Sequence, residues 1–311
     1  MRWRYARAAL AVACVVAVGV GGFALLYRRP AAPLVPREPD FTAQAVVGTL
    51  TPDGWVEREA AIASAEGERA VSVASGGATA AQAAAPIDAR ALADVYDVTV
   101  APGPIVGGRP TIRTQVSRKG AATPAVVMDR DSETGAVLRR ESYRIDGRLA
   151  TRTELTSVEY GAPSAESVPA VGQTAEPERE MTAEEVALVA GFTPSEPSYV
   201  PEGYRRVGLY GYPGGQGRGR GYAEYRYTDG LRPLSVYERT PGGWGPGGPG
   251  GRGGGRGWGK GGPPETGRAQ VADLGIALSA RQRRGRIIAV VTGDITASDA
   301  VNVLDSIPPG Q

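Results

Sequence analysis

Residues 41 to 160 form a succession of short segments in which apolar and polar residues alternate, separated by turn signals. The segments recur every ~8–12 residues, and strict alternation is typical of strands that bury one face. In the segment 109–117, Ile112, Thr114 and Val116 fall on one face, and mainly polar residues fall on the other. Turn sequences such as TPDG at 51–54 and DG at 146–147 separate the segments. The pattern predicts a curved antiparallel sheet or an open barrel over 41–160.

A second, smaller domain is expected after a linker at 161–180, which is rich in Pro, Ser, Ala and Glu. In the domain at 181–311, Thr182 and Glu185 make a capping box for a short helix that Gly191 can end. Strand-like segments and a closing helix follow, which predicts an α+β domain. Fourteen glycines within 241–264 predict a disordered insertion there, because such a segment cannot pack a core.

The N-terminus carries an uncharged apolar run at residues 8–27, with three arginines before it and two after it. Twenty residues at about 1.5 Å each match a hydrocarbon core of about 30 Å. We expect residues 1–29 to be an uncleaved, single-pass transmembrane signal anchor, followed by a Pro-rich stalk at 30–40. The N-terminus would lie inside the cytoplasmic membrane and the main body outside it, in a periplasmic or extracellular position. A cleaved signal peptide and lipidation at Cys14 are the alternatives.

Composition excludes several function classes. Histidine is absent and Cys14 is the single cysteine, so the usual general base, zinc clusters and Cys–His nucleophiles are missing. We predict no catalytic residues, no metal and no cofactor. The net charge of only +2 does not favour binding to a polyanion. The Gly/Arg segments within 213–262 nevertheless resemble nucleic-acid-binding tracts. With an exported body we expect no nucleic acid, and interpret these segments as a solvated hairpin extension or a contact with anionic lipid or wall polymer.

Several motifs occur together in an order that points to a known family. A Gly-Arg-Pro turn at 108–110 leads a strand, and an Asp-x-x-Thr-Gly turn at 131–135 joins two long strands that end beside an aromatic residue. In the second domain VPEGYRRVGLY, YRYTDGLRPLSVYE and IIAVVTGDITASDAVNVLDSI follow one another. This arrangement resembles the sigma-E regulatory family, RseB or MucB, over residues 41–160 and 181–307.

The resemblance implies a fold and partners. The family's first domain is similar to lipoprotein carriers of the LolA type, which have a half-open antiparallel β-barrel with a hydrophobic concave face. Family members guard a membrane-spanning anti-sigma factor against proteolysis, and they release it when they sense mislocalised lipid or lipoprotein. We therefore expect an anti-sigma factor or another membrane protein, and a lipid or lipoprotein, as partners in envelope stress signalling.

An uncovered apolar face would bind an acyl chain or a partner's side chains without catalytic groups. Alternation suggests seven candidates for lining such a ligand groove: Val46, Ile62, Val73, Ile112, Val116, Val127 and Leu155. Two alternative functions use the same features differently. An anchored lipid or lipoprotein carrier or chaperone would need the groove but no anti-sigma factor, and a structural envelope adaptor would bind wall polymer through the Gly-rich arm at 241–264.

Overall fold

The computed structural model describes residues 39–65, 68–73, 89–161, 179–214, 221–241 and 267–309. The chain divides into two compact units; among the described residues, unit 1 reaches Gly161 and unit 2 begins at Arg179. The predicted anchor, most of the predicted stalk and linker, and nearly all of the Gly-rich insertion lie outside the described residues.

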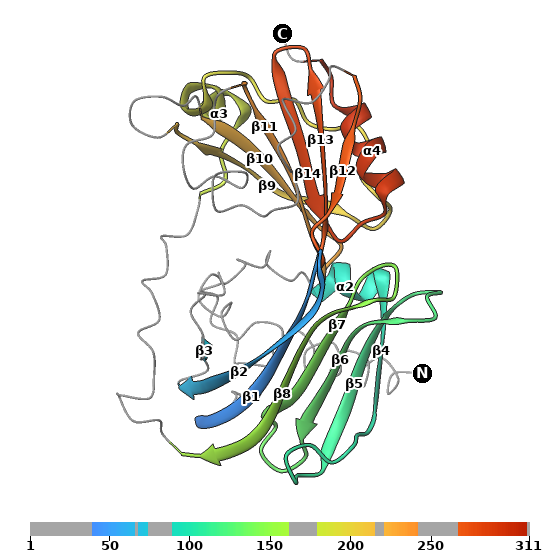
Figure 1. Ribbon diagram of the computed structural model, residues 1–311. Helices are drawn as coiled ribbons and strands as arrows, with labels where there is room; N and C mark the ends of the chain where they lie inside the picture. The colour runs from blue at the N-terminus through green and yellow to red at the C-terminus, as the bar shows by residue number, and fades with distance from the viewer. Residues whose placement is uncertain are drawn as a thin grey trace. The chain divides into compact units, whose positions relative to one another are not determined.

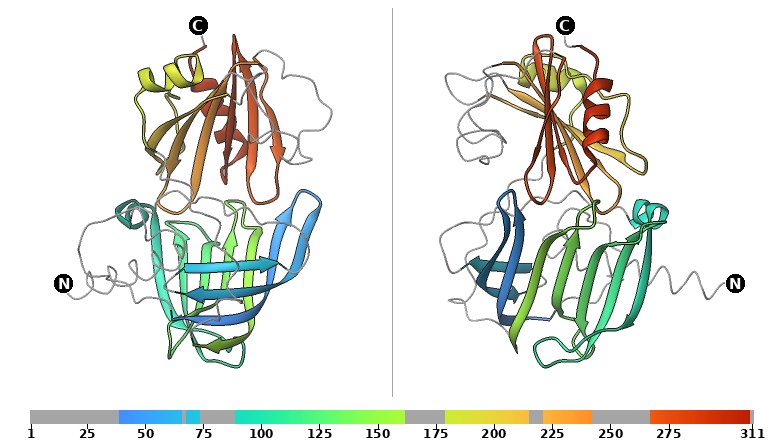
Figure 2. Two further views of the ribbon diagram at one scale, coloured as in Figure 1. Left: turned by 90° about the vertical axis from the view of Figure 1, so that its left-hand side faces the viewer. Right: turned by 45° about the vertical axis from the view of Figure 1, so that its right-hand side comes forward.

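Unit 1 is one antiparallel sheet of eight strands in the order β3-β2-β1-β8-β7-β6-β5-β4 (Figure 1). Its elements are β1 (Phe41–Thr51), β2 (Gly54–Ala65), β3 (Glu68–Val73), α2 (Ala89–Val95), β4 (Tyr96–Pro102), β5 (Thr111–Arg118), β6 (Pro124–Asp131), β7 (Val137–Tyr143) and β8 (Leu149–Tyr160). The two edge strands, β3 and β4, do not pair with each other, so the sheet does not close into a barrel. Figure 2 shows that the β1–β3 end of the sheet bends round in front of the other strands.

Unit 2 is a six-stranded antiparallel sheet in the order β12-β13-β14-β11-β10-β9. Its elements are α3 (Ala183–Ala190), β9 (Arg205–Tyr212), β10 (Tyr222–Thr228), β11 (Pro233–Arg239), β12 (Gln270–Asp273), β13 (Leu278–Arg284), β14 (Ile287–Gly293) and α4 (Ala297–Ser306). Both helices contribute buried side chains to the hydrophobic core of this unit, including Val186 of α3 and Leu304 of α4. They meet Leu209, Tyr225 and Val236 from the sheet, so the core lies between the sheet and the helices.

The local predictions for unit 2 are confirmed. Thr182 accepts a hydrogen bond from the backbone N–H of Glu185, and the Glu185 carboxylate accepts one from the N–H of Thr182 at 2.8 Å. Gly191 ends α3 in the left-handed conformation (φ 79°), which glycine adopts without a steric cost. The described residues also form a mostly β chain with few helices, as predicted.

One helix was not predicted, namely α2 of unit 1.

Candidate functional site

The strand register of unit 1 separates its sheet into two faces, because residues opposite each other in antiparallel strands share a face. Ala43 pairs with Ile62 on one side and with Val158 on the other. We call the face that carries these residues the inner face, since the β1–β3 end bends round it, and the opposite face the outer face. A buried cluster with members from β1, β2 and β8 lies on the inner side: Phe41, Ala43, Ala45, Ile62, Val106, Ala136, Leu138 and Leu155.

The seven predicted groove residues do not share one face. Four belong to the inner face by register, and of these Ile62, Val116 and Leu155 are buried and Ile112 is 42% exposed. Two belong to the outer face: Val46 pairs with Glu59 and Glu154, and Val127 pairs with Glu141. Val73 pairs with Ala60 through its backbone. The structure therefore brings together only part of the predicted set, and the inner face is completed by Phe41 and Leu138, which sequence reasoning did not select.

The inner face leaves apolar side chains exposed near its β4 edge. Val100 of β4 is 52% exposed and Ile112 of β5 is 42% exposed. Val100 lies opposite Thr114, two residues from Ile112, so the two apolar side chains are diagonal neighbours on one face. Farther along the same strands Val116 is fully buried. An apolar ligand that covers Val100 and Ile112 would remove both from water, and each buried methylene contributes about 0.8 kcal/mol.

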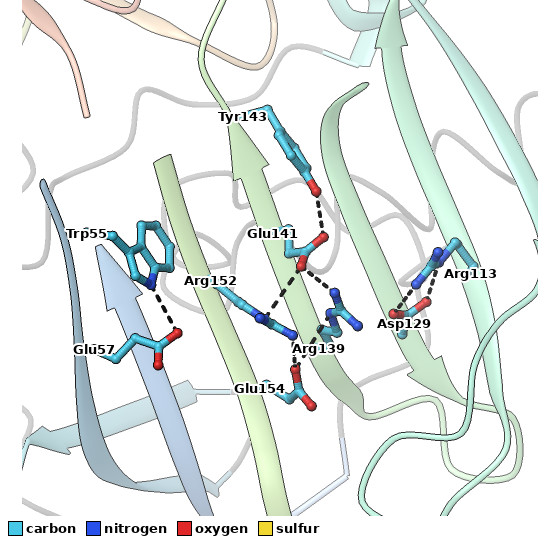
Figure 3. Close-up of polar contacts among 9 residues, drawn as sticks. All are labelled: Trp55, Glu57, Arg113, Asp129, Arg139, Glu141, Tyr143, Arg152 and Glu154. Atoms are coloured by element: carbon cyan, nitrogen blue, oxygen red, sulfur yellow. Dashed lines mark hydrogen bonds and ion pairs between the residues drawn. The ribbon is translucent and has the colours of Figure 1, made fainter. Parts of the chain in front are cut away.

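The outer face carries a ladder of ion pairs across β5 to β8 (Figure 3). Arg113 binds both carboxylate oxygens of Asp129, at 2.8 Å each. Arg139 donates to Glu141 at 2.5 Å, and Arg152 donates to Glu154 at 2.7 Å. Each pair joins an arginine to a carboxylate, so the ladder neutralises its own charge.

Two aromatic side chains, Tyr143 and Trp55, lie on the same face as this ladder (Figure 3). The Tyr143 hydroxyl donates to Glu141 at 2.7 Å, and the Trp55 indole N–H donates to Glu57 at 3.0 Å. Trp55 also covers Gly48: a Cβ atom at that glycine would lie 2.1 Å from the Trp55 ring. The glycine therefore allows the ring to lie against the sheet.

The electrostatics of the ladder favour fixed charges over proton transfer. Burial raises the pKa of Glu141, but the hydrogen bonds from Arg139 and Tyr143 outweigh burial and leave that pKa below its usual value. Burial and the neighbouring Glu141 carboxylate raise the pKa of Tyr143 to about 12. Near pH 7 both groups keep one protonation state, and a general acid or base needs a pKa close to the working pH. This ladder is suited to structure and not to acid–base catalysis.

The motifs that carried the family resemblance in the first domain meet at one corner of unit 1. Arg109, of the Gly-Arg-Pro turn, donates to the buried carboxylate of Asp131, which begins the Asp-x-x-Thr-Gly turn. The hydroxyl of Tyr160 donates to the same carboxylate at 2.6 Å, and Thr134 donates to Tyr160 at 2.9 Å. The guanidinium of Arg109 also lies 5.1 Å from the centre of the Tyr160 ring. The corner ties the end of β8 to the β6–β7 turn and to the loop before β5.

The carboxylate at this corner is held in its charged form. Burial raises the pKa of Asp131, but hydrogen bonds from Tyr160, Arg109 and the backbone of Glu133 lower it to about 2. Asp129 and Asp131 each take an arginine partner, Arg113 and Arg109 respectively. Their carboxylates are thus used in ion pairs, and in the part of the chain that the structure describes no cluster of three metal-ligating side chains occurs.

Comparison with known proteins identifies the fold. The chain matches the structure of MucB in complex with MucA(peri), with a TM-score of 0.53, 20% identity, and coverage of 88% of this chain and 95% of that one. It matches the MucA/MucB complex from Pseudomonas aeruginosa with a TM-score of 0.56 and 18% identity, over 97% of this chain and 99% of that one. No family model and no curated protein matches the sequence. The resemblance to MucB is therefore confirmed at the level of the fold.

The similarity of unit 1 to LolA-type carriers and the N-terminal membrane anchor both stay predictions. A putative outer membrane lipoprotein-sorting protein domain from Vibrio parahaemolyticus matches with a TM-score of only 0.16, which does not establish a shared fold with LolA-type carriers. Within the described ranges no helix is long and apolar enough to cross a membrane, but residues 8–27 lie outside those ranges.

Proposed function

We propose that this protein is a membrane-anchored, extracytoplasmic binding protein that regulates an anti-sigma factor, as the resemblance to the RseB and MucB family implies. The observation that carries the proposal is the shared fold with two MucB structures over nearly the whole length of both chains. Both of those MucB structures contain MucA. The partner of this chain would accordingly be a membrane protein with an extracytoplasmic segment.

The anchor and the ligand belong to the same proposal. The uncharged run at 8–27 would hold the two units at the outer surface of the cytoplasmic membrane. The exposed apolar side chains Val100 and Ile112 give the inner face an affinity for acyl chains or for a partner's apolar side chains. A lipid or lipoprotein that binds there would release the partner by shifting the population of conformations. We propose binding and sensing, with no catalysis.

The same two exposed residues favour a second candidate function. An anchored carrier or chaperone for lipid or lipoprotein would use the inner face in the same way and would need no anti-sigma factor. The third hypothesis, a wall-polymer adaptor, rests on residues 241–264, nearly all of which lie outside the described residues.

Adjacent residues of β4 provide a matched test. A photo-crosslinking amino acid at Val100 reports on the inner face, and the same group at Thr99, which is also exposed, reports on the outer face. The full-length protein is crosslinked in its native membrane, purified and analysed by mass spectrometry for proteins and lipids. An anti-sigma factor in the eluate, with crosslinks from Val100 and few from Thr99, is the expected result.

The alternatives give different eluates. Lipid or lipoprotein crosslinked to Val100 without any anti-sigma factor would support the carrier and refute the regulatory function. Equal crosslinking from both positions would refute the inner face as the binding surface.

A further inference from the structure

The end of unit 1 at which β4 leads into β5 exposes a patch of apolar side chains. Ile105, in the loop between the two strands, is 75% exposed, and Val100 and Ile112 on the flanking strands are exposed as well. Three exposed prolines belong to the same stretch: Pro102, Pro104 and Pro110. Residues 100–108 carry no charge. A single exposed apolar side chain is common on a protein surface, whereas a group of them without charges marks an interaction site.

The β4–β5 loop, residues 103–110, holds Ile105 in a fixed outward position. Val106 and Arg109 exchange two backbone hydrogen bonds of 3.0 Å across a tight turn of two glycines. Val106 is buried in the inner cluster, and Arg109 is paired with the carboxylate of Asp131. Ile105 precedes these fixed residues and stays largely uncovered. The loop therefore presents Ile105 as a rigid apolar tip.

Few backbone groups of this loop need water as a partner. Three residues from 102 to 110 have no N–H, because they are prolines: Pro102, Pro104 and Pro110. The N–H groups of Gly103, Val106 and Arg109 donate to backbone carbonyls of the loop or of β5, at 2.8, 3.0 and 3.0 Å. A backbone group that enters lipid must find its partner within the protein. The tip is thus suited to an apolar environment.

The polypeptide enters unit 1 beside this loop. Phe41, the first residue of β1, belongs to the same buried cluster as Val106. The start of β1 and the β4–β5 loop both lie at the end of unit 1 that is drawn at the bottom of Figure 1. The Tyr160 ring connects them, since its centre lies 6.3 Å from that of Phe41 and 5.1 Å from the guanidinium of Arg109. The segment that follows the predicted anchor at 8–27 therefore reaches unit 1 near its apolar tip.

The length of that segment decides what the tip meets. Residues 28–40 span at most about 45 Å when fully extended, so the end of unit 1 that carries Ile105 stays within reach of the bilayer. A protein partner would need a matching hollow for the protruding side chain, and small ligands bind in concave sites. A fluid bilayer accepts a protruding apolar group without a preformed hollow. The tether and the shape of the tip both favour the membrane as its partner.

We propose that the β4–β5 loop inserts the side chain of Ile105 into the outer leaflet of the cytoplasmic membrane. This contact rests on the membrane anchor of the proposed function, and it adds a second, specific contact between unit 1 and the bilayer. It brings the exposed edge of the inner face, at Val100 and Ile112, next to the leaflet. A lipid or lipoprotein ligand would then reach the inner face directly from the membrane.

The test measures the depth of the tip in proteoliposomes that contain the full-length protein. Cys14, the single cysteine, is replaced by alanine. The fluorophore NBD is then attached to a new cysteine in Ile105→Cys or, as the matched control, in Ala122→Cys. Ala122 is an exposed, uncharged residue of the loop at the other end of β5.

Vesicles of phosphatidylethanolamine and phosphatidylglycerol are prepared with and without phosphatidylcholine that carries a nitroxide quencher on its acyl chain. An inserted side chain reaches the boundary between headgroups and acyl chains. We therefore expect the quencher to lower the emission at position 105 by about twofold or more and to change that at position 122 by less than about a tenth.

A second reporter separates insertion of the tip from lipid binding at the inner face. NBD in Val100→Cys reports on the edge of the inner face. Adding Ile105→Asp should abolish quenching at this position, because a charged side chain is costly in hydrocarbon, whereas Ile105→Leu should retain it. Ile105 is exposed, so we expect both variants to fold, and a circular dichroism melt checks this.

Carbonate washing of the same membranes distinguishes the two proposals. Protein that stays in the membrane while position 105 is quenched no more than position 122 would overturn the insertion and leave the anchor intact. Quenching at Val100 that persists with Ile105→Asp would also overturn it, because lipid would then reach the inner face without the tip. Release of the protein by the wash would refute the anchor, and the insertion with it.

Discussion

We predict that unit 2 loses stability as the pH rises, because it contains a buried carboxylate. Glu238 of β11 is 1% exposed, and its carboxylate accepts a hydrogen bond from the backbone N–H of Ser195, at 3.1 and 3.2 Å from its two oxygens. Burial raises the pKa of Glu238 from 4.5 to about 7, and the Ser195 hydrogen bond lowers it only in part. The folded state therefore favours the neutral acid.

The expected effect follows from this difference. Well below pH 4.5 the Glu238 carboxyl is protonated in both states, so its ionisation does not change the free energy of unfolding. Between pH 4.5 and about 7 the unfolded chain releases its proton first, so stability falls as the pH rises and becomes constant above about pH 7. At about 1.4 kcal/mol per pKa unit, the total loss is about 3 kcal/mol.

Substitution of Glu238 by glutamine tests this reasoning, because glutamine stays neutral and keeps an oxygen for the Ser195 N–H. Unfolding in urea is followed by pulsed hydrogen exchange of peptides from residues 222–239, which report on unit 2. We expect Glu238→Gln to match the wild type at pH 4 and to exceed it by about 3 kcal/mol at pH 8. Glu180→Gln, at an exposed carboxylate of the same unit, should stay within about 0.5 kcal/mol throughout. A stability difference for Glu238→Gln that does not vary with pH would refute the raised pKa.

Three further predictions concern stability. Asp131→Asn should destabilise unit 1 by about 2 kcal/mol at pH 7, because the pKa of Asp131 is lowered to about 2 in the folded state. The stability difference between the variant and the wild type, measured by urea unfolding, should disappear as the pH is lowered towards 2. Leu155→Ala, in the inner cluster, should lower the free energy of unfolding by about 2–5 kcal/mol. Val46→Ala, on the outer face, should lower it by less than about 1 kcal/mol. Equal losses for the two variants in urea unfolding would contradict the assignment of the two faces. Thr182→Ala removes the α3 cap and should lower the stability of unit 2 by about 1 kcal/mol, visible as faster hydrogen exchange in residues 183–190.

Features that depend on local rules could be predicted from the sequence. The capping box of α3 needs only Thr182 and Glu185 three residues apart, and the structure contains both of its hydrogen bonds. The shared face of Ile112, Thr114 and Val116 needs only the alternation of a strand. The corner at Asp131 could be predicted only in part. The Gly-Arg-Pro and Asp-x-x-Thr-Gly turns could be recognised in the sequence, but the contacts of Arg109 and Tyr160 with Asp131 could not.

The membership of the inner face could not be predicted, for two physical reasons. The buried face of β1 carries Phe41 but also the small Ala43 and Ala45, while Val46 lies on the outer face. Alanine gives only a weak apolar signal, so the more apolar Val46 was selected although it lies on the other face. In addition, a register shift at Gln44/Ala45 changes which residues of β8 share a face with β1. A shift by one residue exchanges the two faces, and a sequence does not reveal such a bulge.

The helix α2 was missed because its support is not local. It has only seven residues and no acidic residue in its first turn, and an isolated helix of that length is not stable in water. Its end is held by Lys119, whose ammonium group donates to the carbonyl oxygens of Ala93 and Asp94 at 2.9 and 2.8 Å. Leu92 is fully buried. A partner 25 residues away in the sequence carries no signal within the helix itself.

The two faces of the unit 1 sheet differ in what a ligand can gain from them. On the outer face the arginines Arg113, Arg139 and Arg152 already have carboxylate partners. A charged ligand would have to break an existing pair to form a new one, so its net gain is small. On the inner face Val100 and Ile112 are in contact with water, and covering them requires no existing interaction to break. An apolar ligand of the kind proposed would therefore gain more free energy over Val100 and Ile112 than a charged ligand would gain at these ion pairs.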